Sequence, residues 1–554
     1  MKCKQCDEIF PLKSNLAVAE ELARLTAFLQ EPEPSCPNPA CPNHAVPVSA
    51  GMPYYKAFGR THSGSQRFRC LTCRKTFALS KPGQRQRKSF KNIDVFDRLM
   101  GKQPFARICQ SLGISMITLY GKIEFFYKQA QAFAADRERR LLMEGPIRDR
   151  LYVCVDRQDY VSNWTQRSDR RNVHLMAIGS ADLTTGYVFG MDLNYDNRVD
   201  FKATDAAAQA AGDYGVPAPF RKFARVWLPQ DYALAVANSK LPTKLPADLT
   251  SIILQTYADA VQREDVESGE IVTRDRKLPG QGAQVHLEYT MYAHFFYLAM
   301  LFKNVSKVRF YCDQESGIRA AMLAAFQERV KRREVDAFYV SIKKELMVWE
   351  KQKALAESRR EFARRQAANP QLSATQIELE MVKENMRHAK TMGKWKDRWV
   401  THPLPNMSEP EKALCYLTDY GDYTEDHLAK LYLRGSLHAI DRFFMQVRRR
   451  LSLLERPIGS ASAARRMWYG YSAYNPSSIE KLLAIFRVYY NYVLIGQDRQ
   501  TAAMRLGLAR GPVTIDDILR FDKYANLRKP LSSAAKAKRQ ALKGAAAWLL
   551  GTEP

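Results

Sequence analysis

Apolar runs in the middle of the chain predict the strands of a central sheet. Residues 151–155 are uniformly apolar, as expected for a strand buried on both faces, and Asp156 ends this run. Residues 172–196 predict a strand, a Thr-Thr-Gly turn and a second strand, which together form a hairpin. We therefore expect three antiparallel strands, with a carboxylate at the end of the first one.

Two more strands are expected later in the chain. Residues 308–313 predict a strand that ends in Asp313, followed by a turn at Gly317 and then a helix. Residues 335–342 predict the next strand. Because acids end both the first and the fourth strand, the pattern predicts a site where two carboxylates meet at the centre of a sheet.

Helical periodicity dominates two other regions. Apolar residues three and four positions apart make residues 437–454 an amphipathic helix that packs its stripe on another element. Residues 345–365, and a second segment that follows Pro370 and runs through His388, are rich in charged residues at helical spacing. These two segments predict an α-helical insertion shaped as a hairpin; a dimerising coiled coil is the alternative.

The most apolar stretch of the chain, residues 292–302, contains His294. It is far shorter than the roughly 20 residues that cross a bilayer, so it predicts a buried helix. The chain begins with MKCKQCDEIF and has no apolar segment after its basic start. We therefore expect a cytoplasmic protein without membrane contact, whose cysteines are thiols or ligands.

Residues 105–126 show the spacing of a helix-turn-helix. Ile108 and Leu112 belong to the apolar face of a first helix, Gly113 allows a tight turn, and Ser115 can cap a second helix. In such a motif the second helix lies in the major groove of DNA. The side chains expected to contact DNA from this helix are Thr118, Tyr120 and Lys122.

Charge narrows the range of partners. The 554 residues include 85 Lys and Arg but only 58 Asp and Glu, which gives a formal net charge of +27. Such an excess favours a polyanion, most often nucleic acid, although a cationic protein of the membrane surface has the same composition. With 46% apolar and 11% aromatic residues, the chain is globular rather than disordered.

Six of the ten cysteines fall in pairs within the first 73 residues. Cys36 and Cys41 bound the sequence CPNPAC, and Cys70 and Cys73 form a C-x-x-C. Two cysteine pairs separated by a strand-rich stretch are typical of tetrahedral zinc sites, so these four predict a Zn²⁺ site. The role of the remaining pair, Cys3 and Cys6, stays open. These cysteines could form a second metal site with His44 or His62, contact a partner chain, or have no such role.

The predicted zinc module is strongly basic. No acidic residue occurs between Glu33 and Asp94, whereas eleven Lys and Arg residues lie between positions 56 and 91. Charge of one sign around a zinc ribbon, interleaved with Phe68 and Phe77, is typical of a phosphate-binding surface. The side chains expected to contact DNA are Arg67, Arg69, Arg74, Lys75, Arg85 and Arg87.

The order of zinc ribbon, helix-turn-helix and strand-borne acids resembles bacterial insertion-sequence transposases of the DDE type. Their catalytic domain has the RNase H-like fold that retroviral integrases share. The segment RVYYNYVLIGQDRQTAAMRLGLARG is similar to the family's closing segment, in which a helix ends in Tyr-Asn before a Thr-Pro-Ala-like turn. Here Thr501, Ala502 and Ala503 stand at that turn, without its proline. The resemblance covers residues 30–130, 150–200, 285–345 and 430–520.

The resemblance implies a triad of carboxylates that holds two Mg²⁺ (or Mn²⁺) ions for phosphodiester chemistry. Asp156 and Asp313 match its first two positions by their strand contexts. For the third we choose Asp441, whose context IDRFFMQVR is similar to that of the family's acid, with Glu455 in reserve. Along one helix these two would stand about 21 Å apart, so both cannot reach one metal pair. Most members of the family have Glu at this third position. Their second and third acids are also separated by fewer residues than the 128 between Asp313 and Asp441.

The resemblance therefore implies a multimeric, nucleoid-associated DNA transposase, which binds double-stranded DNA at the ends of a mobile element and performs metal-dependent cleavage and strand transfer. Two alternatives remain: a DNA-binding regulator with an inactive RNase H-like domain, and a metal-dependent nuclease. The expected fold is α/β, an RNase H-like mixed sheet flanked by helices. Its expected parts are the zinc ribbon (1–90), the helix-turn-helix (91–145), the core with an insertion at about 197–278 (150–345), an α-helical insertion (346–430), the closing helices of the core (431–525) and a basic tail (526–554).

Overall fold

The computed structural model describes most of the chain. The described residues are 12–30, 33–62, 64–83, 86–146, 148–239, 248–262, 272–315, 317–343, 346–393, 395–457 and 467–528. Some of the predictions concern residues outside these ranges, namely Cys3, Cys6, Arg85 and the part of the basic tail beyond residue 528.

The N-terminal ribbon, residues 33–83, contains a three-stranded antiparallel sheet. At its centre Phe68 pairs with Ala57 on one side and with Phe77 on the other. A small core of its own, which includes Tyr55, Phe68 and the cysteines, holds the ribbon together. The strands are β1 (Tyr55–Arg60), β2 (Gln66–Cys70) and β3 (Thr76–Leu79).

Three helices follow the ribbon: α2 (Asn92–Met100), α3 (Phe105–Leu112) and α4 (Met116–Glu144). Gly113 ends α3 in the left-handed conformation, with φ 57°. Ser115 caps α4, because its side chain accepts a hydrogen bond from the N–H of Thr118. The two helices and their glycine turn lie where the sequence predicted them.

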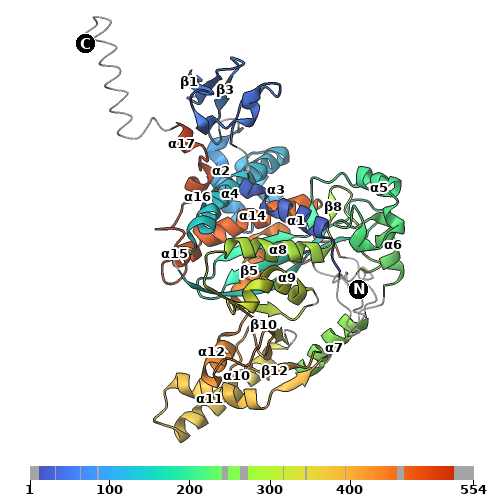
Figure 1. Cartoon of the computed structure of the whole chain (residues 1–554), viewed down its shortest axis with the longest axis vertical. Coiled ribbons are helices and arrows are strands. Elements are labelled where there is room, and N and C mark those ends of the chain that lie inside the picture. Colours follow the sequence, from blue (N-terminus) through green and yellow to red (C-terminus); the bar gives the residue numbers. More distant parts are fainter. Residues whose placement is uncertain are drawn as a thin grey trace, which may run out of the picture.

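An eight-stranded mixed sheet lies at the centre of the molecule (Figure 1), in the order β11-β12-β13-β10-β9-β4-β5-β6. Strands β4, β5 and β6 are antiparallel neighbours, whereas β4, β9 and β10 run parallel. All five predicted strands are present, and the strands that carry Asp156 and Asp313 are adjacent. Their bounds are β4 (Arg150–Ser162), β5 (Val173–Asp182), β6 (Val188–Leu193), β9 (Lys307–Asp313) and β10 (Val335–Ile342).

Strand β4 is longer than predicted, so Asp156 does not end it. Its parallel pairing with β9 stops at Val155 and Cys312, but its antiparallel pairing with β5 continues to Ser162. Polar residues are tolerated in this continuation because β9 no longer covers that edge of β4. Asp156 therefore lies at the point where the parallel neighbour ends.

The second insertion is not purely helical, which corrects the predicted α-helical insertion. Its charged segments do form a helical hairpin, α10 (Val348–Ala368) and α11 (Ala374–Arg387), at the far end of the molecule from the ribbon (Figure 1). Three short strands follow and extend the central sheet, because β13 pairs antiparallel with β10. They are β11 (Lys390–Met392), β12 (Asp397–Thr401) and β13 (Lys412–Tyr416).

Helices cover both faces of the sheet, and two glycines show how closely. A Cβ at Gly179 would lie 2.8 Å from Cδ1 of Ile440, and a Cβ at Gly190 would lie 2.7 Å from Cε1 of His294. Because Gly190 pairs with Ser180, these two glycines point to opposite faces. One face is thus covered by α13 (His438–Arg450) and the other by α8 (Leu287–Leu301), the predicted buried helix.

The closing helices fasten the outer strand of the sheet. Asn491, the predicted Tyr-Asn position, donates to the carbonyl of Val188 and accepts from its N–H, so it pairs with the open edge of β6. The remaining elements are α1 (Asn15–Thr26), β7 (Tyr195–Asp196), α5 (Phe201–Ala210), α6 (Pro229–Ala237), α7 (Leu249–Gln262), β8 (Ala283–Gln284), α9 (Ile318–Lys331), α12 (Glu425–Arg434), α14 (Pro476–Tyr492), α15 (Ala502–Leu506), α16 (Ile515–Leu519) and α17 (Ala525–Arg528).

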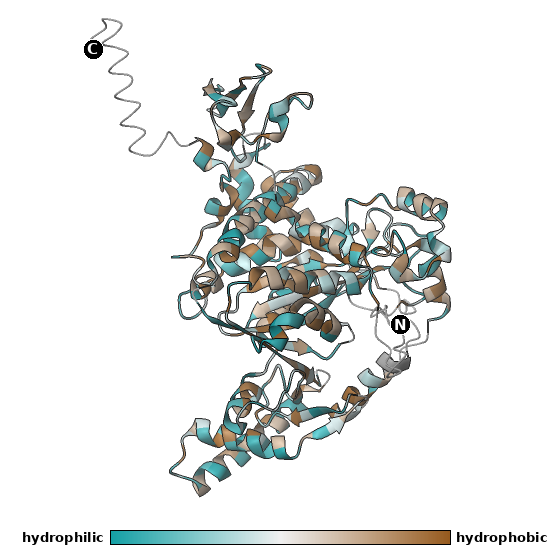
Figure 2. Cartoon of the chain, in the orientation of Figure 1, coloured by the Kyte–Doolittle hydropathy of each residue, from teal (hydrophilic) through white to brown (hydrophobic). Residues whose placement is uncertain are grey.

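Hydrophobic and hydrophilic residues alternate along the outer helices (Figure 2), as in amphipathic elements that pack on a core. Among the helices of the described ranges, none combines the length and the apolar character needed to span a membrane.

Candidate active site and zinc centre

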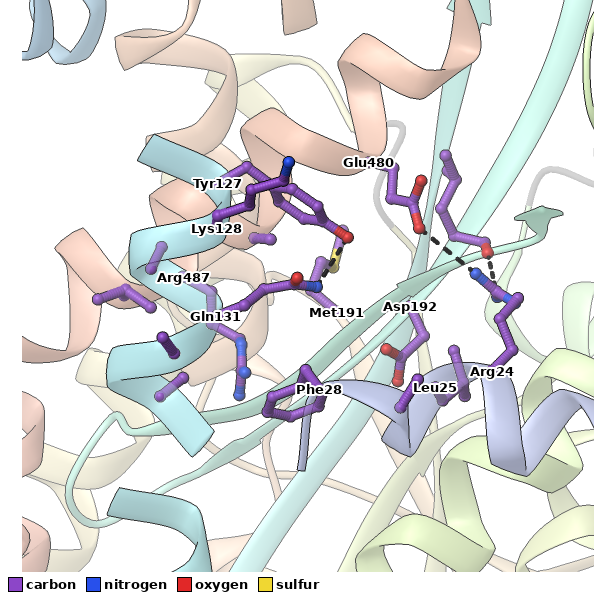
Figure 3. A pocket seen from close by; sticks show the side chains of 18 of the residues that line it. Arg24, Leu25, Phe28, Tyr127, Lys128, Gln131, Met191, Asp192, Glu480 and Arg487 are labelled. Carbon is purple, nitrogen blue, oxygen red and sulfur yellow. Dashed lines mark hydrogen bonds and ion pairs between the residues drawn. The ribbon is translucent and has the colours of Figure 1, made fainter. Parts of the chain in front are cut away.

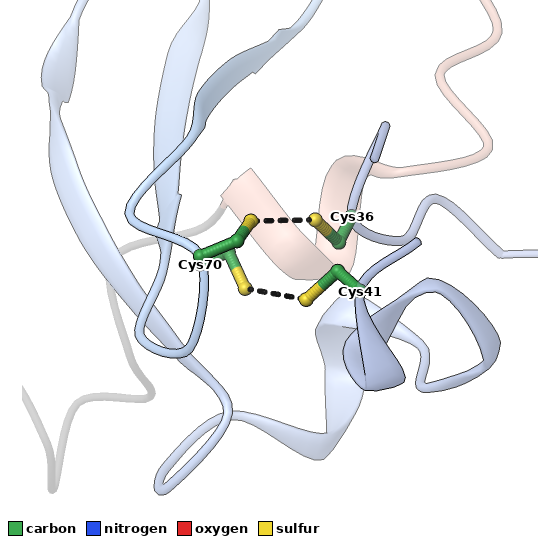
Figure 4. A group of neighbouring side chains, drawn as sticks. Cys36, Cys41 and Cys70 are labelled. Carbon is green, nitrogen blue, oxygen red and sulfur yellow. Dashed lines mark hydrogen bonds between the residues drawn. The ribbon is translucent and has the colours of Figure 1, made fainter. Parts of the chain in front are cut away.

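Four cysteines of the ribbon converge on one point. The Sγ atoms of Cys36 and Cys73 are 3.3 Å apart, those of Cys41 and Cys70 are 3.7 Å apart, and all four lie within 4.8 Å of one another. Tetrahedral zinc with Zn–S bonds of about 2.3 Å needs sulfurs roughly 3.8 Å apart. The four predicted residues can therefore hold a zinc ion, and Figure 4 shows how Cys36, Cys41 and Cys70 point toward one another.

The surroundings of Cys70 favour the thiolate, which is the form that binds metal. Burial raises the pKa of this thiol, but hydrogen bonds from the backbone N–H groups of Cys73 and Thr72 outweigh it and lower the pKa to about 6. The side-chain amide of Asn43 also donates to Cys70 Sγ at 3.3 Å. Polar groups of the fold are thus already aimed at the sulfur that would carry negative charge.

Several predicted DNA-contacting side chains lie on the surface of the ribbon. The guanidinium groups of Arg67 and Arg69 stack over the ring of Phe58, at 5.3 and 5.4 Å from its centroid. Arg74 and Lys75 are exposed in the turn that follows Cys73. Stacking on an aromatic ring holds an arginine side chain extended while its charge still faces solvent.

Lys122 does not lie on the exposed face of α4 as predicted. Its side chain is only 1% exposed, and Nζ donates to the carbonyls of Arg87 and Lys88 and to Oδ1 of Asn92. Burial, together with the charge of Lys91, lowers its pKa. Because its spacing along α4 places it toward α2, Lys122 fastens the basic segment before α2 rather than contacting a partner. Arg87, Thr118 and Tyr120 remain accessible.

All four predicted acids line one cleft of about 470 Å³, here called the acidic cleft. They come from β4, the end of β9, α13 and the segment just after α13. Its charged lining comprises Asp156, Arg157, Asp159, His174, Asp313, Glu315, Asp441, Arg448, Glu455 and Arg456.

The alternation of side chains along the strands explains why the acids meet. Asp156 pairs across the sheet with Gly179, which faces α13, so Asp156 faces α13 as well. Asp313 lies two residues after Tyr311 on β9, and Tyr311 donates to a carbonyl of α12 on the same side of the sheet. The two strand acids therefore point to the face that α13 covers.

Asp441 and Glu455 reach this cleft by different routes. The predicted helix through Glu455 is wrong: α13 ends at Arg450, and a 3-10 turn leads the chain back toward the cleft. The straight-helix separation therefore does not apply. Asp441 lies in the first turn of α13, while the carboxylate of Glu455 accepts from Lys102 Nζ at 2.9 Å and from the Tyr469 hydroxyl at 3.0 Å.

Cations of the cleft are partly engaged already. Arg157 forms an ion pair with Glu315 at 2.5 Å. Burial raises the pKa of Glu315 to about 7, with Asp156 and Asp159 adding to the effect against Arg157. Sequence analysis missed this pair, although Arg157 follows Asp156 directly and Glu315 lies in the turn just after Asp313. Burial and the nearby Arg456 lower the pKa of Arg448, which lies close to both Asp441 and Asp156.

The carboxylates of the acidic cleft lie farther apart than the ligands of a single metal ion. In the described ranges, the cysteine group is the one set of three or more possible ligands whose atoms all lie within 4.8 Å of one another. Two hard cations about 3.5 to 4 Å apart would need carboxylates over a wider span than one ion does. The oxygen donors of the cleft match the ligand preference of Mg²⁺ and Mn²⁺.

A larger cavity, about 630 Å³, lies between α4, α14 and the residues around Phe28 (Figure 3). Two of its arginines form ion pairs: Arg24 lies 3.6 Å from Glu480 and 2.6 Å from Glu21, and Arg487 lies 2.6 Å from Glu138. These ion pairs join α1, α4 and α14 and stabilise the packing of the three helices.

Comparison of the chain with models of known protein families and with curated protein sequences finds no match to either.

Proposed function

We propose that the protein is a DNA transposase of the DDE type, with an RNase H-like catalytic core. The observation that carries the proposal is the convergence of Asp156, Asp313 and Asp441 on one cleft, although 285 residues of sequence separate the first from the last. The ribbon and the helix-turn-helix would hold DNA, and the acidic cleft would cleave and join it.

Strand order supports the RNase H-like assignment. Strands β6, β5 and β4 are antiparallel, β9 and β10 continue in parallel, and a helix connects the last two. This order places the first and fourth core strands side by side at the centre of the sheet, each with an acid at the same edge. Strands β11 to β13 would then be an addition beyond the core.

The donor set of the cleft supports metal-dependent phosphodiester chemistry. Two bound Mg²⁺ or Mn²⁺ ions would supply activation of the attacking oxygen and stabilisation of the leaving oxygen. Asp156, Asp313 and Asp441 would hold them through carboxylate oxygens. Arg448, which lines the same cleft, would attract a phosphate and orient the acid of α13.

Electrostatics support a division between binding and chemistry. The ribbon has no acidic residue between Glu33 and Asp94, so its surface attracts the phosphate backbone without competing for metal. The acids needed for metal binding lie instead in the central sheet. A neutral or acidic surface would not attract the phosphate backbone, so a protein with a partner other than nucleic acid would not need its basic residues kept apart from its acids.

A cleavage assay tests the proposal. The substrate is a duplex carrying the inverted repeats that flank the coding sequence, incubated with full-length protein, Mg²⁺ and a supercoiled target plasmid. We expect Asp156→Ala and Asp313→Ala to lower strand cleavage by at least a hundredfold, because each removes a metal-holding carboxylate. Asp159→Asn, a more exposed acid of the same cleft, is the matched control and should stay near wild type.

The outcomes separate the alternatives. Cleavage without joined products would indicate a nuclease, and DNA binding without cleavage in either metal would indicate a regulator. Normal cleavage by Asp156→Ala protein that is folded and binds DNA would show that the acidic cleft is not the active site.

A further inference from the structure

The exposed face of the first two turns of α4 is unusually apolar. Ile117 is 85% exposed, Tyr120 is 48% exposed and Met116 is 40% exposed. These three residues are here called the recognition face. Ile117 is among the most exposed large apolar side chains of the described chain, whereas Leu119 and Ile123, on the opposite side of α4, are buried.

The recognition face lacks the side chains that usually form paired hydrogen bonds with bases. Between Ser115 and Glu124, a fully described stretch, Lys122 is the one long cation, and it points inward to Asn92. Glu124 is engaged by Lys481 at 2.8 Å and by Lys128 at 3.2 Å. The outward-facing side chains of these two turns therefore offer apolar surface, apart from the hydroxyl groups of Thr118 and Tyr120.

Cations flank this apolar face. Lys88 donates to the carbonyl of Gly113 at 2.7 Å, and Lys91 donates to the carbonyl of Leu112. Both therefore bring their charge to the turn that precedes α4, and Arg107 is exposed on α3. A positive rim around an apolar centre matches the major groove, where phosphates border the base edges.

The chemistry of the groove identifies the apolar contact. Of the groups that the four base pairs present in the major groove, the 5-methyl group of thymine is the apolar one. A second copy of this chain is a poorer occupant, because each copy carries a net charge of +27 and the rim of the face is positive. Burying Ile117 against methyl groups instead removes apolar surface from water while the rim meets phosphates.

We propose that the recognition face of α4 recognises thymine methyl groups, so that the DNA bound by the helix-turn-helix contains A·T pairs at the positions below Ile117. This inference rests on the DNA-binding part of the proposed function. Ile117 makes the central contact, with Met116 and Tyr120 beside it. Phe105 supports Tyr120 from α3, with ring centroids 5.7 Å apart.

Thymine-to-uracil exchange tests the proposal directly, because deoxyuridine pairs like thymidine but lacks the methyl group. Full-length protein first selects its preferred duplexes from a pool with a random central segment of 20 base pairs. The selected duplex is then prepared with thymidine or with deoxyuridine, and both affinities are measured at one salt concentration. We expect about fourfold weaker binding for each contacted methyl group that is removed.

Ile117→Ala, tested on the same two duplexes, combines the change in the protein with the change in the DNA in one thermodynamic cycle. We expect this variant to bind the thymidine duplex about tenfold more weakly than wild type and to lose the difference between the two duplexes. Ile93→Ala removes an isoleucine that is exposed on α2 instead of α4, so it should keep the wild-type difference. Circular dichroism of both variants confirms that the fold is retained.

Each other outcome overturns the inference in a recognisable way. Equal affinity of the wild type for both duplexes, or selection of G·C pairs alone or of no motif, excludes methyl recognition. A change in oligomeric state of Ile117→Ala, with unchanged methyl sensitivity, assigns the face to a second copy. Absence of binding to any duplex, even at low salt, contradicts the proposed function as a whole.

Discussion

Asp441 and Glu455 share the acidic cleft, but their surroundings differ. Glu455 already binds Lys102 and Tyr469, and both contacts hold the chain after α13 against neighbouring segments. Asp441 lines the cleft together with Asp156 and Arg448, and it lies in the first turn of a helix, where negative charge is favoured. The position of Asp441 at the start of α13, in one cleft with both strand acids, favours it as the third metal ligand of the proposed site.

Asp441→Asn should therefore lower Mg²⁺-dependent cleavage at least a hundredfold without a large change in melting temperature. Glu455→Gln should keep most of the cleavage rate but lower the free energy of unfolding by about 1 kcal/mol, because a partly exposed ion pair contributes little. Cleavage rates and thermal melting of both proteins are the measurements. Loss of cleavage only in Glu455→Gln would reverse the assignment.

His402 makes stability depend on pH. Its Nε2 donates to the carbonyl of Leu433, while the N–H of Leu404 donates to its Nδ1, so the neutral ring fits its site. Burial, together with the charge of Lys412, lowers the pKa of His402 to about 3, against about 6.5 in an unfolded chain. As the pH falls below 6.5, the unfolded state binds the proton first, so stability is lost between pH 6.5 and 3.

We expect His402 to reduce the free energy of unfolding by up to about 1.4 kcal/mol per pH unit in that window. Urea denaturation at pH 7.5, 6 and 5 measures the slope. His402→Gln should reduce the slope, because His286 and His174, whose pKa values burial also lowers, still contribute, whereas His388→Gln, at an exposed histidine after α11, should leave it unchanged. Equal slopes in all three proteins would contradict the role of His402.

At the scale of single residues, spacing and local context were enough to select Cys36, Cys41, Cys70 and Cys73, because zinc ligands come in short-range pairs. Strand context selected Asp156 and Asp313, and the resemblance selected Asp441. The separation expected between Asp441 and Glu455 does not apply, because α13 ends at Arg450 and both acids line one cleft. It failed for Lys122, since a long cation on a helix is expected outside. Only the structure shows that the start of α2 and the segment before it supply three oxygen acceptors for the ammonium group of Lys122.

Helix α13 approaches the sheet closely because Gly179 has no side chain. A Cβ there would lie 2.8 Å from Ile440 and 3.0 Å from Phe444 of α13, and 3.1 Å from the sulfur of Met191. Such contacts are shorter than side chains accept, so α13 would have to move outward. Because Asp441 follows Ile440, the position of α13 also sets the position of the third acid.

Gly179→Ala should therefore cost about 1 to 3 kcal/mol of stability and lower cleavage more than DNA binding. Chemical denaturation and the cleavage assay measure the two effects. Gly215→Ala is the matched control, because a Cβ at Gly215 would meet nothing within 4 Å. Unchanged cleavage in a folded Gly179→Ala protein would show that α13 does not position the acid.

Element boundaries were less predictable than element types. The polar residues after Asp156 interrupt the apolar run, so the continuation of β4 depends on its partner β5 rather than on its own pattern. Strands β11 to β13 are three to five residues long and carry charged residues, which leaves too little periodicity to recognise. They form because β10 offers them an edge.

In the whole molecule, the ribbon is a separate unit with its own small core. That core contains all four cysteines, and Tyr524 and Leu527 near α17 pack against it, whereas the sheet belongs to a different and much larger core. Small cores of this kind depend on a crosslink or a metal for stability. The ribbon should therefore lose its structure without zinc while the sheet remains folded.

Metal analysis of the purified protein should find about one zinc per chain. Chelation, or Cys70→Ser, should weaken DNA binding and expose residues 33–83 to proteolysis, while the melting of the central sheet stays near that of untreated protein. Ser80→Ala, in the segment after β3, is a control that keeps all four sulfurs. A ribbon that resists proteolysis without zinc would contradict the metal's structural role.

The order of the cysteine cluster, the helices around Gly113 and the strands of the sheet was predictable, because each has a local signature in the sequence. Their mutual arrangement was not, since it depends on contacts between distant segments. Gln129 of α4, for example, donates to the carbonyls of Leu519 and Phe521, and this joins the helix-turn-helix to the closing segment that also touches the ribbon.

Helix α4 is 29 residues long, and under the proposed function this length has a consequence for where DNA would be cut. The whole helix is about 43 Å long. Ile117 of the recognition face lies about 32 Å along it from Glu138, which binds Arg487 of α14 and Tyr297 of α8 in the core. A rod fixed at its inner end keeps the bound base pairs at one distance from the acidic cleft. The protein would thus act as a ruler: base pairs inserted between the bound sequence and the cut would move the cut to a new phosphodiester, at the original count from the bound sequence.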